Sequence, residues 1–170
     1  PLTATADKDI ALGTDAKLLV VLNDEQKGAE QSVTVTGGSV QFVDANGNVL
    51  CDGASYSMPT YTVGKGWTGA NRFAGANIVI DFAETTEETV DLTAILGSVT
   101  TLSKLTVTGS KGGTITDTNT TVTACTEVVV TAGGRTNVPA SLTSLATTVT
   151  GPTTEGSLLY VTGETTTTEA

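Results

Sequence analysis

The sequence predicts an all-β protein, and three observations lead to this prediction. Threonine supplies 36 of the 170 residues and valine 19, and both side chains are β-branched and favour strands. Apolar residues recur in short runs and seldom at sustained helical spacing. Glycine, at 19 residues, interrupts these runs as it does at turns. We expect a mainly antiparallel, sandwich-like N-terminal region, then a β-rich region with repeat-like features and one or two short helical turns.

Two apolar segments are the clearest strands before residue 88. Residues 16–22 read Ala-Lys-Leu-Leu-Val-Val-Leu, and this nearly unbroken apolar run predicts a strand buried on both faces. Residues 76–82, Ala-Asn-Ile-Val-Ile-Asp-Phe, predict another strand. Between them, residues 32–36 alternate with period two, as a strand with one buried face does. Residues 1–88 are therefore expected to form the sandwich-like region.

Residues 44–48, Asp-Ala-Asn-Gly-Asn, predict a β-hairpin between strands at 40–43 and 49–50. Asn46 and Gly47 both tolerate the positive φ angle that a type I′ turn requires. The segment resembles hairpins of bacterial and viral immunoglobulin-like modules. Its alternating oxygen side chains also suggest a calcium loop, but valine and serine stand where an EF-hand loop needs its glycine and its bidentate glutamate. We therefore expect a plain hairpin and no metal site.

Residues 55–77 form a glycine-rich, nearly charge-free segment that holds four of the seven aromatic residues. One interpretation is a loop that binds a glycan or a protein partner, because aromatic faces bury area at low entropic cost and glycine lets a ligand approach the backbone. The candidate contact residues are Tyr56, Tyr61, Lys65, Trp67, Arg72 and Phe73. The other interpretation is structural: the loop lies over a sheet, and Trp67 closes an open end of the core.

After a polar hinge at residues 84–88, residues 89–163 are expected to form the second β-rich region. A recurring Val-Thr-Gly or Val-Thr-Ala ends its apolar runs, at residues 107–109, 130–132, 149–151 and 161–163. Two units, Leu102-x-x-Leu105-x-Val107 and Cys125-x-x-Val128-x-Val130, share one pattern, and Leu142-x-x-Leu145 forms a partial third.

This pattern resembles a degenerate leucine-rich repeat, whose unit of roughly 20 to 29 residues buries its face by stacking on its neighbours. Short helical turns would suit residues 91–96, capped by their first residue, and residues 139–146, where a proline stands first. Ser110 and Gly133 stand where the repeat would have an asparagine three residues after the strand. The alternative is that the recurring tripeptides end the strands of an ordinary sandwich.

Composition argues against several classes of function. The sequence has no histidine, which removes the commonest general base, the triads that depend on imidazole, and the commonest transition-metal ligand. A net charge of -10 argues against binding to nucleic acid, and no segment approaches the ~20 apolar residues of a spanning helix. A hydrolase would need paired carboxylates, and Asp81 with Asp91 or Glu84 is the only pair worth naming. We therefore expect a protein that is not an enzyme and has no cofactor.

The chain ends and the two cysteines add three expectations. Residues 1–3, Pro-Leu-Thr, show no basic or apolar leader, so synthesis in a cytosol without a signal peptide is expected. Residues 164–170 are low in complexity and are expected to form a flexible tail, or an arm that only a neighbouring molecule orders. Cys51 and Cys125 show no spacing pattern, and the sequence leaves open whether they are bridged.

The short strands, hydroxyl-rich faces and Leu-x-x-Leu-x-Val pattern resemble the fibre, decoration and tail-associated proteins of bacteriophage virions. The resemblance rests mainly on residues 91–163. It implies a structural protein of a viral particle or extracellular assembly, whose partners are other structural subunits, copies of itself in a homo-oligomer, and a surface glycan. The alternative function is a carbohydrate- or receptor-binding module that uses residues 55–77.

Overall fold

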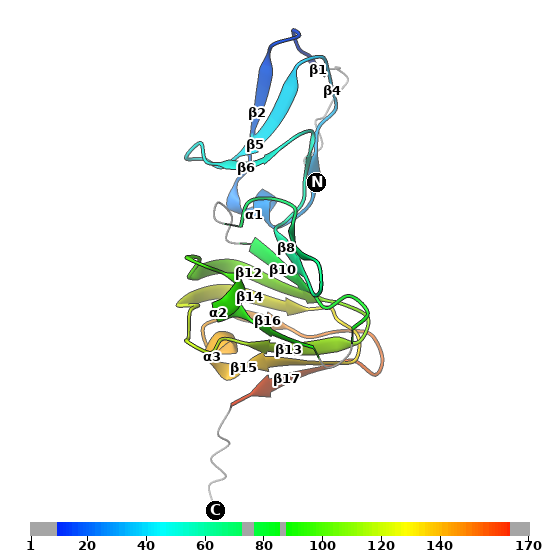
Figure 1. Cartoon of the computed structure of the whole chain (residues 1–170), viewed down its shortest axis with the longest axis vertical. Coiled ribbons are helices and arrows are strands. Elements are labelled where there is room, and N and C mark those ends of the chain that lie inside the picture. The colour runs from blue at the N-terminus through cyan, green and yellow to red at the C-terminus, as the bar shows by residue number, and fades with distance from the viewer. Residues whose placement is uncertain (1–9, 73–76, 86–87, 164–170) are drawn as a thin grey trace, which may run out of the picture.

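The computed structural model describes residues 10–72, 77–85 and 88–163, and in these ranges the fold is all-β. The described residues form seventeen strands and three helices, and each helix has four residues. Strands β1 to β7 form a small N-terminal region, and strands β8 to β17 form a larger unit beside it (Figure 1). Within the described residues, no helix is long and apolar enough to cross a membrane.

The N-terminal region is a set of short, mixed sheets around one apolar cluster. Its elements are β1 (Ile10–Ala11), β2 (Lys17–Val21), α1 (Asp24–Lys27), β3 (Gln31–Ser32), β4 (Val35–Thr36), β5 (Ser39–Val43), β6 (Val49–Asp52) and β7 (Ser55–Tyr56). β2 pairs with β5 in parallel and β5 with β6 antiparallel, while β1–β4 is parallel and β3–β7 antiparallel. The pairing is mixed because α1, β3 and β4 carry the chain back to start β5 beside β2, so the expectation of a mainly antiparallel region is wrong here.

The strand β2 is buried on one face only, which corrects the expectation of burial on both faces. Leu18 and Val20 are half-buried against the N-terminal apolar cluster. Leu19 and Val21 lie on the opposite face and are 53% and 56% exposed. The physical reason is that β2 is the edge strand of a three-stranded sheet whose outer face carries no second layer over these two side chains.

The hairpin between β5 and β6 is confirmed, but its turn differs from the expected type I′. Gly47 has a φ of 82°, whereas Asn46 is not among the residues with positive φ. The Asp44 carboxylate accepts hydrogen bonds from the backbone N–H groups of Asn46 and Asn48 at 2.9 and 2.8 Å. A carboxylate that binds the turn backbone in this way stabilises a type I turn followed by one left-handed glycine.

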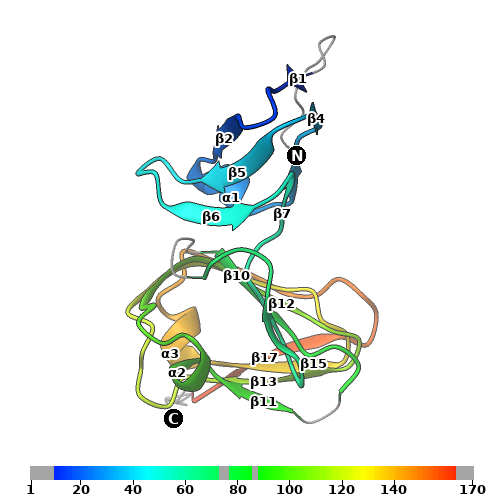
Figure 2. The same ribbon diagram turned by 45° about the horizontal axis from the view of Figure 1, so that its top comes forward.

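Strands β8 to β17 form a parallel solenoid. They are β8 (Thr60–Thr62), β9 (Gly66–Thr68), β10 (Asn77–Asp81), β11 (Thr89–Asp91), β12 (Thr101–Thr108), β13 (Gly112–Thr116), β14 (Ala124–Val130), β15 (Arg135–Pro139), β16 (Thr148–Thr150) and β17 (Leu158–Thr162). One sheet has the order β16-β14-β12-β10-β8-β9 and the other β11-β13-β15-β17, with every pair parallel except β8–β9. The chain alternates between the two sheets, so each coil stacks on the previous one (Figure 2).

The strand register confirms the repeat-like interpretation and rejects the ordinary sandwich. Leu102 pairs with Cys125, Leu105 with Val128 and Val107 with Val130, so the two units stack position on position. All six side chains are buried in the solenoid core. On the other sheet, Thr114 pairs with Asn137 and Asn137 with Tyr160. A coil therefore advances by about 23 residues in each sheet, in the range of leucine-rich repeats.

Two details of the repeat were predicted wrongly. Val149 pairs with Val128, two residues before the Val130 of the recurring tripeptide, and Val161 lies in the other sheet opposite Val138. The four tripeptides therefore do not mark one structural position. The partial unit Leu142-x-x-Leu145 is also displaced, because Leu142 is buried in helix α3 (Ala140–Thr143) rather than in a strand.

Both predicted helical turns are present on the same side of the solenoid (Figure 1). α2 (Leu92–Ile95) begins after Asp91, whose side chain accepts a hydrogen bond from the Thr93 N–H. α3 begins after Pro139, which is the N-cap residue rather than the first helical residue. In the coil between them, the corresponding segment is a turn held by Asp117. The Asp117 carboxylate accepts hydrogen bonds from the N–H groups of Thr121 and Val122.

Glycines at the corner between the two sheets explain why the asparagine of the repeat is absent. A Cβ atom on Gly133 would overlap the carbonyl oxygen of Ser110 in the previous coil, and one on Gly134 would overlap that of Lys111. The coils approach too closely here for any larger side chain at position 133. Backbone hydrogen bonds, such as Gly133 N–H to Gly109 O at 2.8 Å, hold the corner instead.

The apolar side chains pack in two clusters, one in each region. The N-terminal cluster extends from Leu22 to Ala70, and the solenoid cluster extends from Ile78 to Leu142. The predicted boundary at residues 84–88 lies within the solenoid, because β10 before it pairs with β12 after it. Cys51 packs against the first cluster and Cys125 lies in the second, and both are free thiols.

Candidate interaction surfaces

Within the aromatic segment, β8 and β9 form a hairpin over residues 60–68 at the first end of the solenoid. Tyr61 on β8 pairs with Trp67 on β9, and their rings meet edge to face with centroids 5.5 Å apart. The Trp67 indole N–H donates to the Ile95 carbonyl at 3.3 Å, and the Arg72 guanidinium carbon lies 5.2 Å from the indole centroid. Trp67 is half-buried against the solenoid cluster. This geometry corresponds to the structural interpretation, in which Trp67 closes an open end of the core.

The other candidate contact residues are dispersed. Tyr56 belongs to the N-terminal cluster, where it is 1% exposed, lies 6.0 Å from the Phe42 ring and donates its hydroxyl hydrogen to the Lys27 carbonyl at 2.7 Å. Burial raises the pKa of Tyr56 to about 12. Lys65 is exposed in the β8–β9 turn, and Phe73 lies outside the described residues. Tyr56 is therefore a core residue and not a contact for a glycan or partner.

Asp81 and Asp91, which the sequence singled out as an acid pair, both accept hydrogen bonds from backbone N–H groups. Asp81 accepts a hydrogen bond from the Ala83 N–H at 2.7 Å. Asp91 accepts from the Thr118 hydroxyl at 2.6 Å, and this bond is the main cause that lowers the pKa of Asp91 below its usual range. A general acid needs a raised pKa, so Asp91 has the opposite character. Across the described parts of the chain, no three Cys, Asp or Glu side chains cluster as a metal site would require.

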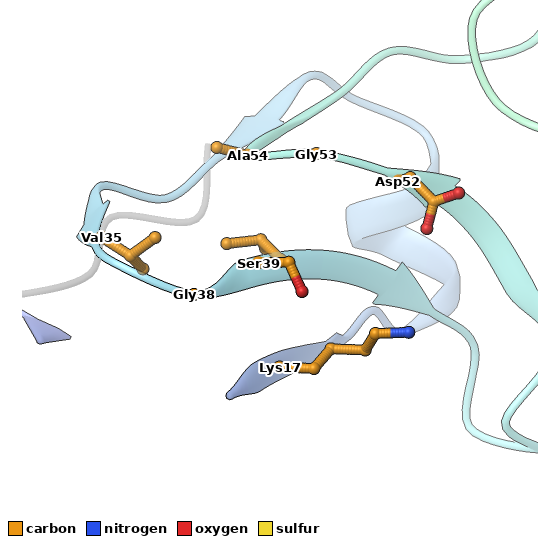
Figure 3. A pocket seen from close by; sticks show the side chains of 8 residues that line it. Lys17, Val35, Gly38, Ser39, Asp52, Gly53 and Ala54 are labelled. Atoms are coloured by element: carbon orange, nitrogen blue, oxygen red, sulfur yellow. The ribbon is translucent and has the colours of Figure 1, made fainter. Parts of the chain in front are cut away.

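One hollow of about 470 Å³ lies on the N-terminal region (Figure 3). It is lined by Lys17, Val35, Gly38, Ser39, Val40, Asp52, Gly53 and Ala54, from β2, β4, β5 and the β6–β7 turn. Asp52 accepts a hydrogen bond from Gln41 at 2.8 Å, and Lys17 is exposed. The hollow has one charge of each sign and small residues at its floor, which offers a ligand few specific contacts.

Exposed apolar side chains form the more distinctive surface. Of the large apolar residues in the described ranges, those at least two-fifths exposed are Leu19, Val21 and Val49 in the N-terminal region and Leu145, Val149, Leu158 and Tyr160 in the solenoid. The last four all belong to the final coil. We call these four residues the end surface. The strand β17, which carries Leu158 and Tyr160, is drawn in red at the end of the solenoid furthest from the N-terminal region (Figure 1).

Within the end surface, the Tyr160 ring contacts the preceding coil. The Arg135 guanidinium carbon lies 4.1 Å from the centroid of the Tyr160 ring, and Arg135 Nε donates to Asn137 Oδ1 at 2.9 Å. Asn137 in turn donates to the Thr114 hydroxyl at 2.9 Å. A row of side chains across three neighbouring strands therefore holds the Tyr160 ring in place while 47% of the residue remains exposed.

Charge is almost absent from the final coil. Residues 144–163 contain one charged side chain, Glu155, in a chain whose net charge is -10. Sequence reasoning missed this surface, because the end of a solenoid is recognised only when the last coil is known. The available signal was the apolar run at residues 158–161, Leu-Leu-Tyr-Val, in a stretch of twenty residues with one charged side chain. Comparison with protein-family models, with curated proteins and with solved structures gives no match.

Proposed function

We propose that this protein is a non-enzymatic structural component of a viral particle or extracellular assembly, and that it acts by self-association. The observation that carries the proposal is the end surface, where four large apolar side chains are exposed on one coil. Larger apolar patches on a protein surface mark interaction sites. Solenoid repeats bury their faces against neighbours, so large apolar side chains exposed on the last described coil favour a contact with a partner there.

The charge distribution supports association through this surface. A net charge of -10 makes two copies repel each other, and salt screens this repulsion beyond ~8 Å at physiological ionic strength. Contacts between copies must therefore be apolar and backbone contacts in a region of low charge. The final coil meets both conditions, since Glu155 is its one charged residue between positions 144 and 163.

Light scattering coupled to size-exclusion chromatography tests the proposal on the full chain. Samples from about 1 to about 500 μM cover the dissociation constants of tight and of weak homo-oligomers. We expect the molar mass to rise above the 17.2 kDa of one chain, and to rise at lower protein concentration when the salt concentration is raised, because screening weakens the repulsion. A mass of one chain at every protein and salt concentration would contradict the proposal.

A further inference from the structure

We propose that two copies join at their end surfaces through their β17 strands, which pair antiparallel about a twofold axis at Tyr160. The inference rests on the proposed function and names the partner and the contact. β17 pairs with β15 on one side, and on its other side it has no strand partner among residues 10–72, 77–85 and 88–163. An open strand edge carries unpaired N–H and C=O groups and readily pairs with another strand.

β17 lacks the features that usually protect an edge strand. Its five residues, Leu-Leu-Tyr-Val-Thr, include no charge and no proline, and its register with β15 runs without a bulge. The other edges in the solenoid are less suitable. β16 has three residues and is followed closely by Pro152, and β9 has three residues and begins with Gly66. β11, at the other edge of the same sheet as β17, has three residues and ends with the charged Asp91. β17 is therefore the edge best suited to accept a further strand.

The direction of the backbone groups sets the register of the pair. The Leu158 N–H donates to Gly134 O in the preceding coil, so in a regular strand Leu158, Tyr160 and Thr162 face β15. Leu159 and Val161 then direct their N–H and C=O groups to the open edge. In an antiparallel pair centred on Tyr160, Leu159 of one copy lies opposite Val161 of the other, and the two exchange both backbone hydrogen bonds.

Side chains match in the same register. Because facing residues in an antiparallel pair point to the same side of the sheet, the two Tyr160 rings meet on the outer face, with each Leu158 opposite a Thr162. Leu159 and Val161, both half-buried at the end of the solenoid, meet on the inner face and join the two apolar cores. The strand is thus complementary to itself.

The opposite end of the solenoid cannot serve as the partner surface. The β8–β9 hairpin covers it, with Trp67 bonded to Ile95, and the N-terminal region lies beyond the hairpin (Figure 2). Head-to-tail stacking into a filament is therefore blocked. A contact between two identical surfaces about a twofold axis closes at two copies, so the expected species is a dimer.

The substitution Val161→Pro tests the inference, because it removes an N–H from the open edge and leaves the hydrogen bonds to β15 in place. Leu158→Lys is a second variant that adds charge to the same edge, in case the proline variant does not fold. Leu19→Lys is the matched control, since Leu19 is equally exposed but lies on β2. Circular dichroism and a thermal melt verify folding before the molar mass is measured.

We expect the unaltered chain and Leu19→Lys to reach twice the mass of one chain, and the folded β17 variants to dimerise at least about tenfold more weakly, or 1.4 kcal/mol. Amide hydrogen exchange gives an independent readout: protection of Leu159 and Val161 should rise with protein concentration, while Tyr160, which faces β15, should not change. If the chain self-associates but the β17 variants do so equally well, this contact is wrong and the proposed function stands. A chain that stays monomeric throughout would overturn both.

Discussion

The ring of Phe82 occupies the place that a side chain at position 113 would need. A Cβ atom on Gly113 would overlap Cδ1 and Cε1 of Phe82, and Phe82 is fully buried. The two residues lie in consecutive coils, just after β10 and in β13. A large side chain in one coil is thus accommodated by a glycine in the next coil.

Gly113→Ala should therefore destabilise the fold by about 1–3 kcal/mol, the usual cost of overpacking a core. Gly113 has no positive φ, so the effect would be steric and not conformational. Urea unfolding measures it, with Gly13→Ala as the control because nothing lies within 4 Å of a Cβ at Gly13. Adding Phe82→Leu to Gly113→Ala should recover part of the loss. Equal stability of the two alanine variants would show that the coils can separate to make room.

Trp67→Ala should lower the free energy of unfolding by about 2 kcal/mol, roughly half the cost of truncating a fully buried aromatic residue. The change removes the contact with Tyr61, the hydrogen bond to Ile95 and the stacking of Arg72. Leu19→Ala serves as the control, since that side chain is exposed, and should change stability by less than about 0.5 kcal/mol. A Trp67→Ala variant with unchanged stability but lost binding on a glycan array would instead favour the carbohydrate-binding alternative.

The repeat could be predicted where one residue type marks one structural position. Leu105 has an apolar residue three positions before it and a valine two positions after it, and Val128 has the same neighbours at the same spacing. This shared spacing identified the two strands that stack on each other. It failed in the last described coil, where Val149 pairs with Val128 and a glycine follows Val149 by two positions. Among the described residues this coil has a neighbouring coil on one side only, so fewer of its side chains need to keep the pattern.

Two other features lay beyond sequence reasoning for a physical reason. Tyr56 and Trp67 read alike in a glycine-rich segment, yet the first is in the N-terminal cluster and the second is in the solenoid. Only the long-range contacts with Lys27 and Ile95 separate them. The position of the predicted boundary at residues 84–88 is a similar case, since only the pairing of β10 with β12 shows that the solenoid continues across it.

The stability that Asp91 contributes should depend on pH. Hydrogen bonds from Thr118 and Thr93 lower the pKa of the folded carboxyl below 3.8, the ordinary value of an aspartate side chain. A lowered folded pKa means that the contribution is complete above pH 3.8 and is lost as the pH falls through the folded value. Asp91→Ala should thus melt at a lower temperature than the unaltered chain at pH 7, and the difference should shrink below pH 3.8. Asp15→Ala, at an exposed loop position, is the control. A difference that is constant from pH 7 down to pH 2.5 would show that the charge has no part in it.

The β5–β6 turn gives a prediction that separates two turn types with two single substitutions. Because only Gly47 adopts a positive φ, at 82°, Gly47→Ala should cost about 1 kcal/mol, the lower end of the cost of a left-handed conformation for a residue with a Cβ. No atom lies within 4 Å of a Cβ at this position, so the cost would be conformational. Asn46→Ala should be nearly neutral, since Asn46 donates its backbone N–H to Asp44 and its side chain is exposed. Chemical denaturation of both variants measures the difference. A type I′ turn requires positive φ at both central residues, so comparable losses from the two substitutions would restore the turn that the sequence predicts.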